Sequence, residues 1–102
     1  MKIAVSLLAG LLALTSAQAF AAEDANRTIS SVGVQGLGYV QFKEGVSQPC
    51  QFGTIYLPDL SQYNARGMLA VLLAAQSNGL QVTVTYDING SGFCTASKVQ
   101  TQ

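Results

Sequence analysis

The stretch from Gln76 to Cys94, QSNGLQVTVTYDINGSGFC, constrains the fold most, because it contains Asn-Gly twice with one alternating run between the two pairs. The first pair, Asn78-Gly79, follows an apolar segment of helical period. A glycine just past a helix can adopt the left-handed conformation that satisfies the last free carbonyls. The second pair, Asn89-Gly90, separates two strand-like segments, where Asn-Gly is a hairpin-turn signal. The stretch therefore predicts a helix end, a strand over 80–88, and a turn into a further strand over 93–101.

Residues 1–21 have the pattern of a secretory signal peptide. A short positive start, Met1-Lys2, precedes an uncharged apolar run from Ile3 to Leu14, and A-x-A cleavage patterns follow at 17–19 and 19–21. The run is shorter than the roughly 20 apolar residues that a membrane span needs, so an uncleaved anchor is the less favoured alternative. We expect export to the periplasm or the medium and a single domain over 22–102.

The charge and the apolar pattern of that domain argue against two classes of partner. Beyond residue 21 the chain keeps four basic and five acidic side chains, a net charge of −1. Nucleic-acid binders usually carry a basic patch, and none is visible, so we expect no nucleic-acid partner. No second apolar stretch is long enough for a bilayer, so we expect no membrane insertion after signal cleavage.

The chain has two cysteines, Cys50 and Cys94, and no histidine. In an exported chain an even pair predicts one disulfide. In the chain-entropy model, closing this loop would stabilise the fold by about 4 kcal/mol, which matters for so small a domain. A reactive thiol and a zinc site are less favoured, the zinc site because histidine ligands are missing.

Strand and helix patterns follow one another along the domain. The polar segment 22–27 is expected to be loose, strands are predicted over 28–34, 39–43 and 50–57, and a helix runs from a cap at Asp59 or Ser61 to about Ser77. One helix face is apolar: Met68, Leu69, Val71, Leu72, Leu73 and Ala75. The opposite face has small side chains edged by two larger ones. Either its alanines face water at little cost, or another subunit covers it, and in the second case the interface residues would be Tyr63, Arg66, Gly67, Ala70 and Ala74.

The element order is strand, strand, strand, helix, strand, strand. It predicts a mainly-β chain with one helix, folded as a small five-stranded OB-fold-like barrel with the helix between strands three and four. The alternative is an α+β arrangement in which one helix lies across an open antiparallel sheet. Periodicity does not separate the two.

The order and spacing of several short motifs add a resemblance to a known family. The relevant residues are Ile29-Ser30 to Val34, Cys50, the helix 63–77, Gly79 to Val84, and Cys94. In these the chain resembles the secreted OB-fold B subunits of pentameric bacterial toxins of the pertussis, subtilase and typhoid type, and also small uncharacterised exported bacterial proteins. The resemblance implies an oligomer that binds glycans, with Arg27, Ser30 and Ser31 as candidate ligand contacts. The chain is shorter than the toxin subunits, and a full sugar pocket does not align.

The remaining chemistry favours binding over catalysis. There is no histidine, the cysteines are assigned to a disulfide, and Asp59 and Asp87 are better explained as a helix cap and a turn residue. We therefore expect no enzyme activity, cofactor or metal. On the second strand Tyr39, Gln41 and Lys43 point outward and would suit a sugar or a peptide. The favoured function is an exported binding module, whose most specific form is a glycan-binding oligomer. The alternative is a monomeric periplasmic interaction or inhibitor protein.

Overall fold

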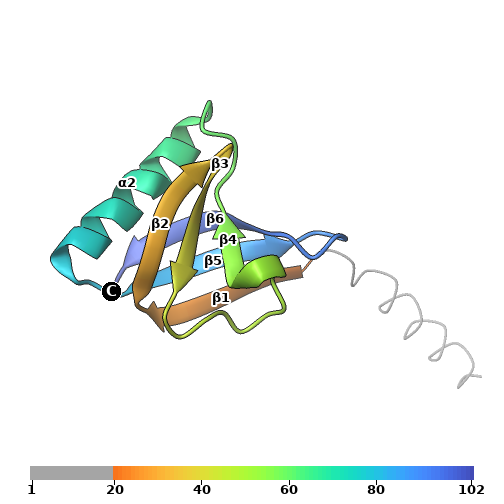
Figure 1. The fold of residues 1–102 in the computed structure, drawn as a ribbon, viewed down its shortest axis with the longest axis horizontal. Helices are drawn as coiled ribbons and strands as arrows, with labels where there is room; N and C mark the ends of the chain where they lie inside the picture. The colour runs from red at the N-terminus through yellow and green to blue at the C-terminus, as the bar shows by residue number, and fades with distance from the viewer. Residues whose placement is uncertain (1–19) are drawn as a thin grey trace, which may run out of the picture.

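The structure is a computed structural model that describes residues 20–102, so the predicted signal peptide lies almost wholly outside the described residues (Figure 1). The described chain is mainly β, with one α-helix and one disulfide, as predicted. Its elements are β1 (Phe20–Arg27), β2 (Ile29–Gln35), β3 (Leu37–Phe42), the 3₁₀ turn η1 (Gln51–Gly53), β4 (Thr54–Tyr56), α2 (Tyr63–Asn78), β5 (Val82–Ile88) and β6 (Cys94–Thr101).

The strands form one six-stranded sheet in the order β1-β5-β6-β4-β3-β2. β4 and β6 are parallel, and the other neighbours are antiparallel. β1 and β2 are the two edges of this order, although Thr28 alone separates them in the chain. Figure 1 shows the chain turning sharply between these two strands, so that the sheet is strongly bent.

Alternating side chains of the strands and one face of the helix make the core. Val40 and Phe42 of β3 point inward, which agrees with the prediction that Tyr39 and Gln41 point outward. Val82, Val84 and Tyr86 of β5 point inward as well. The buried cluster is Ile29, Val40, Phe42, Ile55, Leu57, Met68, Leu72, Ala75, Val82, Val84, Tyr86, Cys94 and Ala96. The disulfide half-cystine Cys94 is therefore part of the core itself.

The end of α2 is as predicted, and its start is not. Gly79 is left-handed (φ 66°), and its N–H donates to the carbonyls of Ala75 and Gln76. The N–H of Leu80 also donates to the Ala75 carbonyl at 2.9 Å, which completes a Schellman motif. The helix begins at Tyr63 after Gln62, and no side chain caps it.

The predicted cap residues lie in the turn before the helix. The Asp59 carboxylate accepts a hydrogen bond from the Ser61 N–H at 2.8 Å, so it stabilises that turn and does not cap the helix. The prediction that Asp59 or Ser61 caps the helix is therefore wrong: the N-cap position is Gln62, and the Asp59 side chain is used in the Asx turn. One residue of the predicted apolar face is also misplaced: Leu73 is 45% exposed.

Two strand predictions also need correction. The segment 22–27, expected to be loose, belongs to β1, whose backbone pairs with β5 from Phe20↔Ile88 onward. The third predicted strand, over 50–57, is regular only over Thr54–Tyr56, because Phe52 and Gly53 both have positive φ. The sheet therefore has six strands where the sequence predicted five.

Candidate ligand-binding surface

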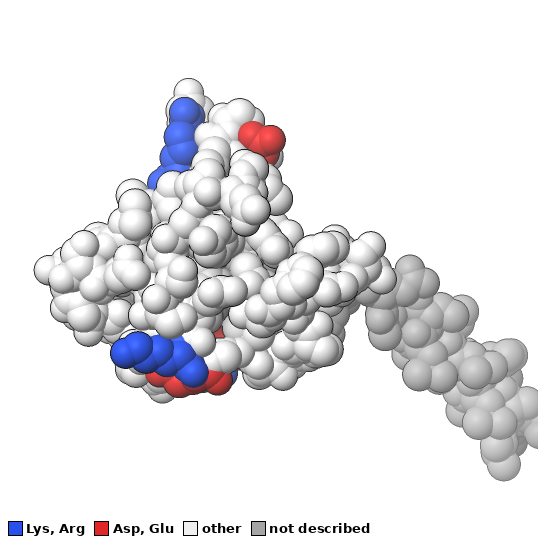
Figure 2. Space-filling view, in the orientation of Figure 1, with Lys and Arg blue, Asp and Glu red and all other residues white. Residues whose placement is uncertain are grey.

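The outer face of β3 and β4 carries a hollow of about 520 Å³. Its lining comes from β2, β3, η1 and β4, and consists of Gln35, Tyr39, Gln41, Phe52, Thr54 and Tyr56. None of these side chains is charged. In the view of Figure 2 the charged side chains gather at two ends of the molecule, and a broad uncharged area lies between them.

A glycine in the neighbouring strand makes room for Tyr39. Gly33 of β2 pairs with Tyr39 of β3, so both lie on the same face of the sheet. A Cβ atom on Gly33 would lie 2.6 Å from the Tyr39 hydroxyl oxygen and 2.7 Å from its Cζ atom. The phenol ring therefore lies over bare backbone, and this sets its position at the side of the hollow.

Polar groups of the hollow are linked in a short chain. The Gln41 amide donates to the Thr54 hydroxyl at 2.8 Å, and that hydroxyl donates to the Phe52 carbonyl at 3.1 Å. These bonds fix the orientation of the Gln41 amide. Its oxygen has no protein partner within the described residues and can accept a hydrogen bond from a ligand hydroxyl.

The most unusual backbone of the surface is at Phe52. This residue has φ 61° and ψ 15°, and its side chain is 74% exposed. A left-handed conformation costs a non-glycine residue about 1–2 kcal/mol. A strained backbone that presents an aromatic ring to solvent points to a functional role more than to a packing role.

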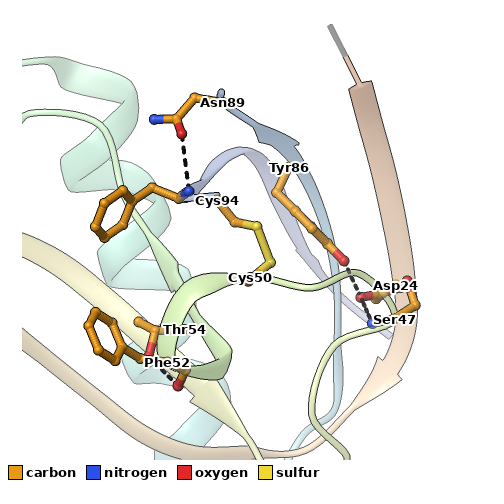
Figure 3. The surroundings of a disulfide bond; sticks show 9 residues. Asp24, Ser47, Cys50, Phe52, Thr54, Tyr86, Asn89 and Cys94 are labelled. Carbon is orange, nitrogen blue, oxygen red and sulfur yellow. Dashed lines mark hydrogen bonds between the residues drawn. A yellow bond between two sulfur atoms is a disulfide. The ribbon is translucent and has the colours of Figure 1, made fainter. Parts of the chain in front are cut away.

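Three contacts hold the Phe52 turn against the loop before β6. Cys50, just before the turn, is bonded to Cys94, and the Gln51 N–H donates to the Gly92 carbonyl at 2.9 Å. The Phe52 ring lies 6.5 Å from the Phe93 ring, measured between centroids. Figure 3 shows the disulfide joining the turn that carries Phe52 to the strand that follows Asn89.

The loop 89–93 is itself ordered by one side chain. The Asn89 carboxamide oxygen accepts from the N–H groups of Ser91 at 2.8 Å and Phe93 at 3.1 Å. The Phe93 ring then meets the Tyr56 ring edge to face, at 5.9 Å. The second Asn-Gly is therefore a strand-to-strand turn, as predicted, and it also positions an aromatic side chain.

A second hollow of about 410 Å³ adjoins the first. It is lined by Leu37, Tyr56, Asn89, Phe93 and Thr95, again without a charged side chain. Tyr56 lines both hollows. Phe93 packs against both Tyr56 and Phe52, so the rings form one aromatic cluster at the junction.

The structure brings together only part of the predicted contact set. Tyr39 and Gln41 line the first hollow, but Lys43 is exposed just beyond the end of β3 and lines neither hollow. Ser30 is exposed and Ser31 half-buried on β2, and neither lines a hollow. Arg27 lines neither hollow either, and its guanidinium lies 3.7 Å from the Asp24 carboxylate.

The aromatic side chains outside the second predicted strand were missed. Phe52 follows Cys50 by two residues, and Phe93 directly precedes Cys94. A disulfide brings the sequence neighbours of its two cysteines close together, so the predicted bond was a signal that these two rings could belong to one site. Tyr56 has no comparable signal, because a tyrosine on a short strand is common in any sheet.

A buried carboxylate lies elsewhere, where β1, β5 and the loop after β3 meet. Asp24 is 3% exposed, and it accepts hydrogen bonds from the Ser47 N–H and hydroxyl and from the Tyr86 hydroxyl, the last at 2.7 Å (Figure 3). Burial by itself would raise the pKa of Asp24, but these hydrogen bonds and the nearby Arg27 outweigh it and hold the pKa below its ordinary value. Burial, together with the Asp24 charge, raises the pKa of Tyr86. The network ties three segments together, and none of its residues lines either hollow.

No group of three or more potential metal ligands is present within residues 20–102. In the same range no helix is long and apolar enough to cross a membrane.

No protein-family model matches the chain, and no curated protein matches it. The geometry of the aromatic surface is therefore the basis on which a function can be proposed.

Proposed function

We propose that the chain is an exported, non-catalytic binding module whose ligand is a neutral glycan. The observation that carries the proposal is the hollow lined by aromatic rings, amides and a hydroxyl, with no charged side chain. The apolar faces of sugar rings pack on aromatic rings, while their hydroxyls need donors and acceptors such as the amides of Gln35 and Gln41. An anionic ligand would lose solvation here without gaining a cationic partner.

An OB-type barrel is the finer fold that we propose. If β1 and β2 are counted as one bent strand, five strands remain, and that bent strand pairs with β5 through one half and with β3 through the other. The helix then lies between strands three and four of the five, and the parallel pair β4–β6 joins strands three and five. OB-type modules commonly bind ligands on the face of strands two and three, where the first hollow lies.

Export and assembly complete the proposal. A signal peptide over 1–21 would direct export, and the Cys50–Cys94 disulfide fits an oxidising compartment. The resemblance to toxin B subunits adds an oligomer formed through the outward face of α2. That face is exposed in the single chain: Tyr63, Arg66, Gly67, Ala70 and Ala74.

A pair of variants tests glycan binding. The mature, oxidised protein is screened on a glycan array, and the best neutral sugar is titrated by calorimetry. We expect Tyr39→Ala to weaken binding about tenfold or more, which corresponds to about 1.4 kcal/mol. Leu80→Ala is the control, because this side chain is 44% exposed, lines neither hollow and lies outside the candidate oligomer interface. Absence of any neutral glycan hit, or equal binding by the Tyr39 variant, would contradict the proposal.

A protein ligand is the second candidate, favoured by apolar side chains beside the same surface. Leu37 is 39% exposed, lines the second hollow and lies on the same face of β3 as Tyr39, whereas the more exposed Val34 pairs with Gly38 and lies on the opposite face of the sheet. A monomeric periplasmic interaction or inhibitor protein would use Leu37 together with Phe52 and Phe93. Leu37→Ser should then abolish binding of the protein partner, and the natural chain should bind no neutral glycan.

A further inference from the structure

We propose that the two hollows are successive subsites of one groove, and that the ligand is a linear neutral oligosaccharide of at least two sugar units. This inference rests on the proposed glycan-binding function and narrows its substrate class. A single terminal sugar would fill only one of the two hollows.

The sheet register places the groove across three neighbouring strands. Tyr39 of β3 pairs with Tyr56 of β4, and Tyr56 pairs with Thr95 of β6. Paired residues on adjacent strands share a face, so these three side chains form a row perpendicular to the strands. With roughly 4.8 Å between strands, the row spans about 10 Å, enough for two consecutive sugar rings.

Each hollow offers the same two kinds of contact. The first has the Tyr39 and Phe52 rings with the amides of Gln35 and Gln41 as polar partners. The second has the Phe93 ring with Asn89 and Thr95 as polar partners. Tyr56 lines both, so its ring lies at the junction between the two sugars.

The groove is held in one shape before any ligand binds. The Cys50–Cys94 disulfide and the Gln51–Gly92 hydrogen bond fix the turn that carries Phe52 to the loop that carries Phe93. A preformed groove loses little entropy on binding, and this favours an extended ligand that contacts both ends.

The far end of the row argues against acidic sugars. Asp87 of β5 pairs with Thr95 and so continues the row on the same face, just beyond the second hollow. Its carboxylate would repel an anionic sugar seated on Thr95, and no cationic side chain lines either hollow. The two hollows together therefore favour a neutral chain.

Calorimetry with a length series tests the groove. The probes are the cello-, malto- and chito-oligosaccharide series from one to four units, titrated into the mature, oxidised protein. We expect affinity in the series that binds to rise at least tenfold from one to two units and then to level. Thr95→Val keeps the shape and strand preference of the side chain while removing its hydroxyl, and should weaken binding of the longer sugars only. Thr101→Val, near the other end of β6, is the matched control.

The outcomes separate this inference from the proposed function. If sugars of one, two and four units bind with equal affinity, and Thr95→Val does not change that affinity, the proposed groove is refuted but glycan binding is not. If no sugar of any length binds, or if peptides bind and sugars do not, both proposals fail. A length-dependent gain that Thr95→Val reduces and Thr101→Val does not would support both.

Discussion

Phe52 combines a left-handed backbone conformation with an exposed aromatic ring, and a pair of substitutions tests the effect of each property separately. Phe52→Ala removes the ring but keeps a side chain in the left-handed region, whereas Phe52→Gly removes both the ring and the strain. We expect the glycine variant to be more stable to urea than the alanine variant by about 1 kcal/mol. Both should bind glycan more weakly than the natural chain. Equal stability of the two variants would show that the backbone at Phe52 is not strained.

Asp24 gives the fold a predictable response to acid. The pKa of its carboxyl is lowered in the folded state, although burial opposes this, because Ser47, Tyr86 and Arg27 stabilise the charged form. A group of this kind stabilises the fold above its unfolded pKa, near 4, and that stability is lost as the pH falls through the folded pKa. The free energy of unfolding should therefore fall as the pH is lowered below about 4.

Asp24→Asn removes the charge that causes this part of the acid response. At neutral pH the variant should be about 2 kcal/mol less stable, because hydrogen bonds to a charged acceptor are lost. Near pH 2 the difference should shrink, since the natural carboxyl is then becoming protonated as well. The pKa values of Glu44 and Asp59 are also lowered, so the unfolding free energy of the variant should still depend on pH, with a smaller slope. Urea unfolding followed by circular dichroism at several pH values measures both curves, and identical slopes would refute the assignment.

At the scale of elements, the disulfide joins the start of η1 to the start of β6. Its half-cystines are 44 residues apart in sequence. Replacing both with alanine should cost about 4 kcal/mol of unfolding free energy in the chain-entropy model. The turn that carries Phe52 would then keep only the Gln51–Gly92 hydrogen bond and the Phe52–Phe93 contact, so glycan affinity should fall as well. An unchanged melting temperature for the double variant, or for the natural protein with and without reductant, would contradict this role.

Elements with a regular side-chain pattern were predicted well from the sequence. The alternation in β5 and the Asn78-Gly79 helix end each follow from local chemistry, and both are present. β1 was missed because residues 22–27 are alanines and polar residues without an apolar alternation, and their strand conformation depends on backbone pairing with a distant segment. Only Asp24 in that segment is buried, and a lone aspartate does not indicate a strand.

The smaller part of the candidate site was predictable, for a related reason. Tyr39 and Gln41 stand on a regular strand, where alternation decides which side chains face outward. Phe52 and Phe93 are brought together by the disulfide and by a left-handed turn, which no periodic pattern encodes. Lys43 was predicted with its strand neighbours, but β3 ends one residue earlier, at Phe42.

At the scale of the whole molecule, the outward face of α2 is the place where the proposed oligomeric state can be tested. Tyr63 and Arg66 pack on each other there, with the guanidinium carbon 5.3 Å from the ring centroid. Gly67 lies beside them, and a Cβ atom at Gly67 would meet nothing within 4 Å in the single chain. Gly67→Ala therefore has opposite consequences for a monomer and for an oligomer packed through this face.

In a monomer Gly67→Ala should stabilise the protein by up to about 1 kcal/mol, because alanine is the better helix former and the site is open. In an oligomer whose helices approach closely at this glycine, the added methyl group would separate the subunits and lower both the assembled mass and the melting temperature. Light scattering of the mature, oxidised protein at tens of micromolar gives the mass of each form. Under the proposed assembly we expect an oligomeric natural protein and a Gly67→Ala variant of lower mass. A monomeric natural protein with a more stable variant would refute assembly through α2 and leave the aromatic surface as the single candidate site.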